Sequence, residues 1–426
     1  MRSVEQQLAM VTDSVITPSP VRIAIAEALG LMCAEEVQAT RALPGFPQAA
    51  IDGYAVRAVD VGGARALKGR VVDGDQPQPV AVNEKSLPVV GEVAAGSQRP
   101  LRLQPKQAVR VHTGAPLPTL ADAVLPLEWS DRGTKRVIAH RPVKSGEFVR
   151  RVGDDIQPGD VAVTPGSILG AAHIGLLAAV GRNKVLVYPR PRVSILSIGA
   201  ELVDIDRDPG LGQVYDVNSY ALAAAAREAG AEVHRVGVAA GEPRRLREII
   251  EGQLMRSELL VISGAVGGAA SKRARDLLKE LGEVDISRVA MHPGSVQGFG
   301  LLGDARIPTF LLPSNPVSAL VSFEIFVRPS IRAALGKNST RRRHVRARAL
   351  GPIASKEGRR GYVRARLMRD ADTQDYLVEG LSGATGAPAH LLAGMSEANA
   401  LIRIPEPVGE VRPGDVVDVL FLGQGS

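Results

Sequence analysis

The sequence predicts a multidomain α/β protein in which a region of alternating strands and helices lies between regions of short strands. Between residues 192 and 327, apolar runs of strand length alternate with amphipathic stretches, which is typical of a parallel, doubly wound sheet covered by helices on both faces. Between residues 66 and 136, and again after Gly336, short alternating runs are separated by Pro and Gly. This pattern indicates two further, smaller β domains.

The N-terminal segment is predicted to begin with a short helix. Ser3 and Gln6 have the spacing of a capping box, and apolar residues at helical spacing follow as far as Val11. The pattern of residues 21–36 predicts a second amphipathic helix, in which Cys33 would be a small core residue.

Two small-residue loops follow apolar runs in the central region. Leu259-Leu260-Val261-Ile262 predicts a strand, residues 263–270 are rich in Gly and Ala, and residues 275–281 predict a helix. Residues 311–318 form a second loop, which opens a helix over residues 319–327. A strand, a glycine loop and a helix together point backbone N–H groups at an anion, but the first loop taken alone favours a tight turn without a ligand, because Gly and Ala composition is a weak signal. Two such loops at neighbouring strand ends would build one ligand crevice.

Composition excludes several classes of protein. The chain has one cysteine, so an internal disulfide and a thiolate metal cluster are excluded. Aromatic residues make up 3% of the chain and no nucleic-acid-binding motif is present, so we expect no nucleic-acid partner. No apolar run is long enough to span a bilayer and no signal-peptide pattern is present, so we expect a cytoplasmic protein. The basic run 341–346 is expected to be a solvated linker or strand edge.

Four motifs in order carry a resemblance to a known family. They are Leu43-Pro44-Gly45-Phe46 with Asp52-Gly53-Tyr54-Ala55-Val56, Thr113-Gly114-Ala115-Pro116, Gly153-Asp154-Asp155-Ile156 and Pro313-Ser314-Asn315-Pro316-Val317-Ser318. Together they make the chain resemble the MoeA family, which includes the E domain of gephyrin. The resemblance implies a homodimer of elongated four-domain subunits. The domains would be residues 1–44 with 148–185 (elongated, N-terminal), 45–147 (inserted β), 186–335 (MogA-like α/β) and 336–426 (C-terminal β-barrel).

The resemblance also implies a reaction and a site. Family members act on adenylylated molybdopterin and molybdate with a divalent metal, here Mg²⁺; they cleave the adenylate and place molybdenum on the dithiolene. Carboxylates are hard ligands suited to Mg²⁺, and the implied metal ligands are Asp155 and Glu201. The implied catalytic residues are Asp52, Thr113, Asp155, Glu201, Arg288 and His292. The implied cofactor-binding residues are Ser263, Gly264, Gly267, Gly268, Ser314, Asn315, Pro316 and Ser318.

The chain departs from the family pattern at several of these positions. Lys272 stands where the family has an acid, Gly241 replaces an aspartate, and His292 replaces a lysine with a group that is only partly charged at neutral pH. Ser314 places a Cβ where the family has glycine, and a family serine maps to Ala393 or Gly394. These changes favour a homodimeric scaffold with weak or lost molybdenum insertion, which would need no cofactor. The alternative is an active molybdopterin molybdenumtransferase that releases AMP.

The scaffold hypothesis follows the precedent of gephyrin, which binds a receptor peptide. The matching positions are Glu5, Leu8 and Pro405. Candidate partners are a bacterial tubulin-like filament (FtsZ-like) and the cytoplasmic loop of a membrane receptor, either of which would recruit the protein to the division site or the membrane. Packing of Leu8 against its own core is the competing explanation of that residue.

Overall fold

The computed structural model describes residues 1–62, 86–99, 101–239, 242–267, 271–337, 340–381 and 392–422. The chain divides into two compact units: unit 1 comprises residues 1–23, 30–34 and 186–426, and unit 2 comprises residues 24–29 and 35–185. The four domain boundaries expected from the sequence stay a prediction. Gly241, Gly268 and part of the first expected β region (63–85) lie outside the described residues. None of the described helices is long and apolar enough to cross a membrane.

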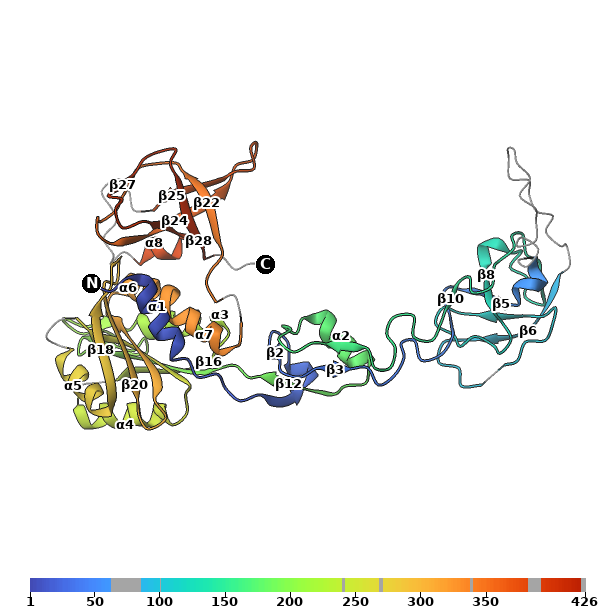
Figure 1. Ribbon diagram of the computed structural model, residues 1–426, viewed down its shortest axis with the longest axis horizontal. Coiled ribbons are helices and arrows are strands. Elements are labelled where there is room, and N and C mark those ends of the chain that lie inside the picture. Colours follow the sequence, from blue (N-terminus) through green and yellow to red (C-terminus); the bar gives the residue numbers. More distant parts are fainter. Residues whose placement is uncertain are drawn as a thin grey trace. The chain divides into compact units, whose positions relative to one another are not determined.

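A six-stranded mixed sheet forms the centre of unit 1 (Figure 1). Its parallel part has the order β16 (Glu232–Ala239), β13 (Arg192–Ile198), β17 (Leu259–Val266) and β21 (Ile307–Pro313). β20 (Val296–Leu302) pairs antiparallel with β21, and β18 (Gly282–Arg288) pairs antiparallel with β20. The expectation of a wholly parallel sheet is therefore wrong at this edge. The connections into and out of β20 are too short for a helical crossover, which requires a dozen or more residues.

Helices cover both faces of this sheet, as the sequence predicted. Along β17, Leu259 and Val261 face one core and Leu260 and Ile262 face the other, because successive side chains of a strand point to opposite faces. Residues of α4 (Pro243–Leu254) and α5 (Lys272–Leu281) share the second core. The first core takes residues from α1 (Val4–Asp13), α3 (Asn218–Ala229), α6 (Pro316–Ser322), a π-helical turn (Phe323–Val327) and α7 (Arg328–Ala334). The second loop therefore opens a helical stretch that begins earlier, at Pro316, and ends later than expected.

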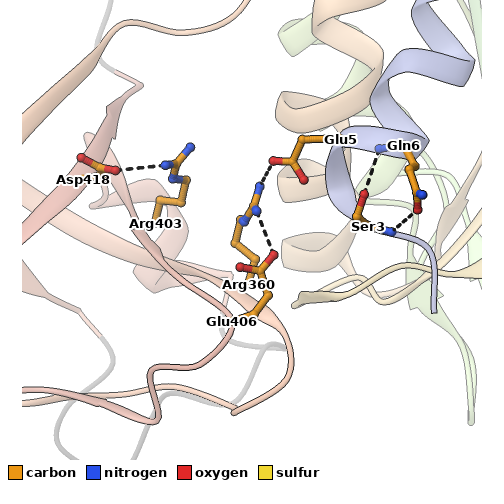
Figure 2. Close-up of polar contacts among 7 residues, drawn as sticks. All are labelled: Ser3, Glu5, Gln6, Arg360, Arg403, Glu406 and Asp418. Atoms are coloured by element: carbon orange, nitrogen blue, oxygen red, sulfur yellow. Dashed lines mark hydrogen bonds and ion pairs between the residues drawn. The ribbon is translucent and has the colours of Figure 1, made fainter.

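The N-terminal helix forms as predicted. In α1, Ser3 Oγ accepts a hydrogen bond from the Gln6 N–H at 3.1 Å, and the Ser3 N–H donates to Gln6 Oε1 at 3.0 Å (Figure 2). Val4, Leu8 and Val11 are buried in the first core. Leu8 is only 8% exposed, which confirms that this residue packs against its own core.

The second predicted helix, over residues 21–36, does not form. The segment contains β1 (Val21–Ala24), one 3-10 turn (Ile25–Glu27) and β2 (Met32–Cys33), and β3 (Val37–Gln38) follows. Gly30 adopts a positive φ of 78°, which interrupts a helix. β1 and β2 pair on either side of the distant β12 (Lys184–Tyr188), a partner that local periodicity cannot reveal. Cys33 is fully buried, as expected, but on a strand.

The C-terminal β region closes into a barrel. The strands β24 (Arg360–Arg369), β25 (Tyr376–Gly380), β22 (His344–Ala349), β28 (Val416–Phe421) and β26 (Ala400–Ile404) pair in that order, and β24 also pairs with β26. Closure removes the free sheet edges. β19 (Met291–His292) adds to β24, β23 (Ile353–Ala354) pairs with β27 (Glu410–Val411), and the short α8 is Ala393–Ser396.

The basic run that opens the barrel is not wholly solvated, so that expectation is wrong for Arg342. Its side chain is 10% exposed and donates to Glu324 at 2.9 Å and to Glu228 at 2.8 Å. Burial opposes the charge, but the two carboxylates outweigh it and raise the pKa of Arg342 above its ordinary value. Arg328 lies close by, and its own burial together with the positive charge of Arg342 lowers the pKa of Arg328 to about 10.

Unit 2 contains the expected small β region. A five-stranded sheet has the order β8 (Ala123–Pro126), β5 (Gly53–Val56), β7 (Ala108–Val111), β6 (Leu87–Val93) and β9 (Arg136–Val137). Short pairs join β4 (Gln48–Ala49) to β10 (Val149–Arg150) and β3 to β11 (Val161–Val163). The helix α2 (Ala171–Ala179) also belongs to unit 2. β10 is only two residues long, and Phe148, the residue before it, has a positive φ of 55°.

Candidate functional site

A cavity lies where the parallel strands of unit 1 end. Ile198 closes β13, Ser263 and Gly264 lie in the last part of β17, and Ser314 follows β21. Open α/β sheets bind ligands outside the carboxyl ends of their strands, so this is the crevice that the two loops predicted. We call it the Glu201 cavity; it is lined by Ile198, Glu201, Leu202, Val214, Tyr215, Asp216, Val217, Asn218, Ser263, Gly264, Ser314, Asn315 and Pro316.

The base of the cavity is a buried network of three polar side chains. Ser197 Oγ donates to Asp216 Oδ1 at 2.8 Å, and the Ser263 hydroxyl lies 3.0 Å from Ser197 Oγ. None of the three residues is more than 1% exposed. Since Ser197 donates to Asp216, Ser263 donates to Ser197, and the network joins the ends of β13 and β17. Asp216 Oδ1 also accepts a hydrogen bond from the Ser219 N–H at 3.1 Å, which caps the start of α3.

Glu201 lies on the rim of the cavity. The turn that carries it is held by the pairing of β14 (Leu202–Val203) with β15 (Val214–Tyr215) and by the hydrogen bond from the Val214 N–H to the Glu201 carbonyl oxygen at 2.8 Å. Its carboxylate folds over Gly199, where a Cβ would lie 2.9 Å from the carboxylate atoms. No described residue donates a hydrogen bond to this exposed carboxylate. Glu201 therefore presents a negative charge that a ligand or metal could meet.

The first glycine loop begins later than the sequence predicted. β17 continues through Ser263 and Gly264 to Val266, with a register shift against β21, so Ser263 is a buried strand residue. Gly264 has a φ of +84°, and a Cβ there would lie 2.0 Å from the carbonyl oxygen of Ile198. Only glycine permits this close approach of two strands. Gly267 also has a positive φ, but a Cβ there would meet none of the described residues within 4 Å, and Gly267 does not line the cavity.

The second loop closes the opposite side of the cavity. Ser314 is exposed, lines the cavity and accepts a hydrogen bond on its carbonyl oxygen from Asn218 Nδ2 at 2.7 Å. Asn315 Oδ1 accepts from the Ser318 N–H at 3.0 Å, and Pro316 is the first residue of α6. The Ser318 N–H is thus used by the helix cap, and Ser318 does not line the cavity.

Three cationic or ionisable positions lie away from the cavity lining. Arg288 is exposed at the end of the edge strand β18, and His292 is on β19 beside the barrel. Partial burial, together with the charges of Lys356 and Arg359, lowers the pKa of His292 below its ordinary value, which favours the neutral imidazole. Lys272 begins α5 and pairs with Asp276 at 2.8 Å, an exposed pair one helical turn apart.

The remaining expected catalytic residues belong to unit 2. Asp52 Oδ1 accepts hydrogen bonds from the N–H of Thr113 at 2.7 Å and from its hydroxyl at 2.8 Å. These bonds hold the pKa of Asp52 below its ordinary value. The Asp155 N–H donates to the Leu43 carbonyl oxygen at 3.0 Å, and its side chain is exposed.

A metal site is not assembled within the described residues, because no group of three His, Cys, Asp or Glu side chains there lies close enough to hold an ion. Of the two metal ligands that the resemblance implies, Glu201 lies in unit 1 and Asp155 lies in unit 2. A magnesium site therefore stays a prediction.

A second cavity in unit 1 contains two of the expected peptide-binding positions. Its lining includes Glu5 and Leu8 of α1, together with apolar residues of the barrel; Pro405 is exposed and is not part of that lining. Arg360 binds the Glu5 carboxylate and lowers the pKa of Glu5.

Asp216 and Asn218 are among the residues of the Glu201 cavity that the sequence did not predict. A signal was available: an aspartate immediately before a predicted helix is a typical cap. Nothing local could show that the same carboxylate meets Ser197, which lies 19 residues earlier.

Family comparisons match all three regions of the chain. The MoeA N-terminal region (domains I and II) matches residues 2–181, the probable molybdopterin-binding domain matches residues 194–333, and the MoeA C-terminal region (domain IV) matches residues 346–422. The chain belongs to the MoeA family. Its central α/β domain and C-terminal barrel are therefore those of a MoeA-like multidomain fold, as the sequence predicted.

Individual relatives agree with this assignment. The chain is 60% identical over 424 residues to molybdopterin molybdenumtransferase 1 of Mycobacterium tuberculosis, covering 100% of both chains. It is 36% identical to molybdopterin molybdenumtransferase 2 of the same species, covering 98% of this chain and 99% of the relative. Among solved structures, the molybdopterin biosynthesis MoeA protein of Pyrococcus horikoshii matches with a TM-score of 0.78 and 31% identity over 99% of each chain.

Proposed function

We propose that this MoeA-family protein is an active molybdopterin molybdenumtransferase, the activity named for the relative that is 60% identical over the full length. The observation that carries the proposal is the Glu201 cavity at the carboxyl ends of β13, β17 and β21. In the proposed reaction, adenylylated molybdopterin and molybdate yield AMP and molybdopterin that carries molybdenum on its dithiolene sulfurs. This reverses the preference for a scaffold that the substitutions in the sequence suggested.

Each part of the cavity has a role in this proposal. The strand ends around Ser263 and Gly264, with the loop at Ser314, receive the substrate. The unpaired Glu201 carboxylate orients the reacting groups, and it is the residue of unit 1 that would contribute to a Mg²⁺ site. Asp52, Thr113 and Asp155 of unit 2 would complete the polar side in an assembled homodimer. The oligomeric state is measurable by light scattering, and a monomer under assay conditions would contradict the dimer.

The experiment supplies adenylylated molybdopterin, molybdate and Mg²⁺ and follows AMP release. Losing one preorganised contact typically costs about a hundred-fold in rate, so we expect Glu201→Gln to slow AMP release by about that factor. Glu248→Gln is the matched control, because Glu248 is an exposed glutamate on α4 outside the cavity. Absence of AMP release by the wild-type protein, or an equal rate for Glu201→Gln, contradicts the proposal.

A peptide-binding scaffold is the second candidate, and it concerns the cavity beside Glu5. We propose it because an apolar and basic lining from α1 and the barrel, including Tyr362 and Leu420, suits a short peptide with apolar and acidic side chains. Candidate partners remain a tubulin-like filament and a membrane receptor. Pro405 is not required in this version.

Leu8 cannot test that candidate, because a charge at a residue 8% exposed would damage the core. Arg341→Glu is a better variant: Arg341 is exposed and lines the cavity, whereas Arg343 is exposed in the same basic run and does not. Peptides from either partner class should lose affinity for Arg341→Glu and keep it for Arg343→Glu. Equal affinity for both variants contradicts peptide binding there.

A further inference from the structure

One oxygen of a buried carboxylate at the Glu201 cavity has no hydrogen-bonding partner among the described residues. Asp216 is 1% exposed and lines the cavity. Its Oδ1 accepts from both Ser197 and Ser219, whereas Oδ2 accepts from none of the residues that the structure describes. Buried polar atoms are paired in nearly all folded proteins, and a carboxylate oxygen can only accept. An unpaired one beside a cavity therefore points to a ligand that donates.

We propose that Asp216 Oδ2 accepts a hydrogen bond from the exocyclic amino group of one of the bound substrate's heterocycles. The inference rests on the proposed function, because it concerns which part of adenylylated molybdopterin lies against α3. A carboxylate repels phosphate and molybdate, so the anionic parts of the substrate lie elsewhere in the cavity. The described residues around Asp216 do not form a metal-binding group, and an amino group on a heterocycle is a donor that the substrate supplies.

Two parts of the substrate carry such a donor. The pterin has a 2-amino group next to a ring N–H, and the adenine has a 6-amino group. Both are planar aminated heterocycles that a single carboxylate oxygen can recognise. The experiment therefore has one arm for each, with simple pterin and AMP as the probes.

Asp216→Asn changes the proposed contact and leaves the internal ones in place. The donors from Ser197 and Ser219 require an oxygen at the Oδ1 position, so the new amide nitrogen must occupy the Oδ2 position. The oxygen that would accept from the ligand is thereby replaced by a nitrogen that donates. Asp206→Asn is the matched control, because it removes the same charge from an exposed position in the loop between β14 and β15.

The affinity of each protein is measured for a probe and for its analogue with a carbonyl in place of the amino group. The pairs are pterin against the 2-oxo pteridine, and AMP against inosine monophosphate. For the wild-type protein, we expect one exchange to weaken binding about ten- to a hundred-fold, the usual effect of a hydrogen bond to a charged group. The pair that responds identifies which heterocycle Asp216 binds.

In Asp216→Asn the preference should vanish or reverse, because an amide N–H bonds a carbonyl and opposes an amino group. Asp206→Asn should keep the wild-type preference. Free Asp216→Asn should unfold at the same temperature as the wild type or a higher one, because a buried unpaired charge is removed. A structural role for Asp216 would instead lower that temperature and leave the preference unchanged.

The outcomes separate this inference from the proposed function. A wild-type protein that binds pterin or AMP but shows less than about a three-fold preference in both pairs overturns the role of Asp216 and leaves the function standing. The same holds if Asp216→Asn retains the full wild-type preference. A wild-type protein that binds neither probe, nor adenylylated molybdopterin, overturns both.

Discussion

Arg360 of the C-terminal barrel donates a hydrogen bond of 2.8 Å to Glu406, and its other terminal nitrogen binds the carboxylate of Glu5 in α1 (Figure 2). The Arg360 side chain is 15% exposed, so this cation is largely withdrawn from water between the two carboxylates. A single side chain thereby ties the first helix of the chain to a barrel strand more than 350 residues away.

Truncating this link should destabilise unit 1. We expect Arg360→Ala to lower the free energy of unfolding by about 1–3 kcal/mol, because it leaves the half-buried Glu406 without its partner. Thermal unfolding measures the effect. The control is Arg366→Ala on the same strand, since Arg366 and Glu397 form an exposed pair 3.9 Å apart that should contribute less than about 0.5 kcal/mol. Equal effects of the two substitutions would contradict the distinction.

The Glu5–Arg360 contact should also make stability depend on acid. The hydrogen bond from Arg360 lowers the pKa of Glu5 below its ordinary value of 4.5. A depressed carboxyl pKa contributes stability that is fully present above the unfolded-state pKa and is lost as pH falls through the folded-state value. The wild type should therefore unfold at a higher temperature than Glu5→Gln near neutral pH, and the difference should shrink below pH 4.5. A difference in unfolding temperature that grows as the pH falls would contradict this prediction.

The two positive-φ glycines of the first loop give a matched pair. Gly264→Ala places a Cβ 2.0 Å from the Ile198 carbonyl oxygen, whereas Gly267→Ala, with nearly the same φ, meets open space. We expect Gly267→Ala to cost about 1–2 kcal/mol from backbone strain alone, and Gly264→Ala to cost clearly more because two strands must separate. Denaturant unfolding compares them. Similar costs for the two substitutions would mean that β13 and β17 can move apart at little cost in free energy.

Asp52 offers a test of chemistry separate from stability. Asp52→Asn keeps an oxygen for both hydrogen bonds from Thr113 and removes only the charge. If Asp52 acts in the reaction, AMP release should fall by about a hundred-fold with little change in unfolding temperature. Asp154→Asn is the control, since Asp154 also accepts a backbone hydrogen bond, from Arg151 at 2.5 Å, in another exposed turn of unit 2. Loss of activity in both variants, or in neither, would count against a specific role.

Local patterns determined most elements of this protein. The capping box at Ser3, Pro243 at the start of α4, and Gly230 in the left-handed region after α3 act within one helical turn, so the chain alone reveals them. Alternation along the barrel strands likewise follows from the two-residue period of a strand. The position of the cavity followed from the rule that parallel strands bind ligands at their carboxyl ends.

Tertiary contacts decided what local patterns could not. The segment 21–36 contains β1 and β2 and not a helix, because β12, more than 150 residues later in the chain, pairs with both strands and overrides a helical period. Arg342 is buried because Glu324 and Glu228 converge on it from two helical segments. Asp216 is held in place because Ser197 from β13 and Ser219 from α3 both donate to its Oδ1. Periodicity encodes which face of an element is buried, but the partner of a polar group depends on which distant segments meet.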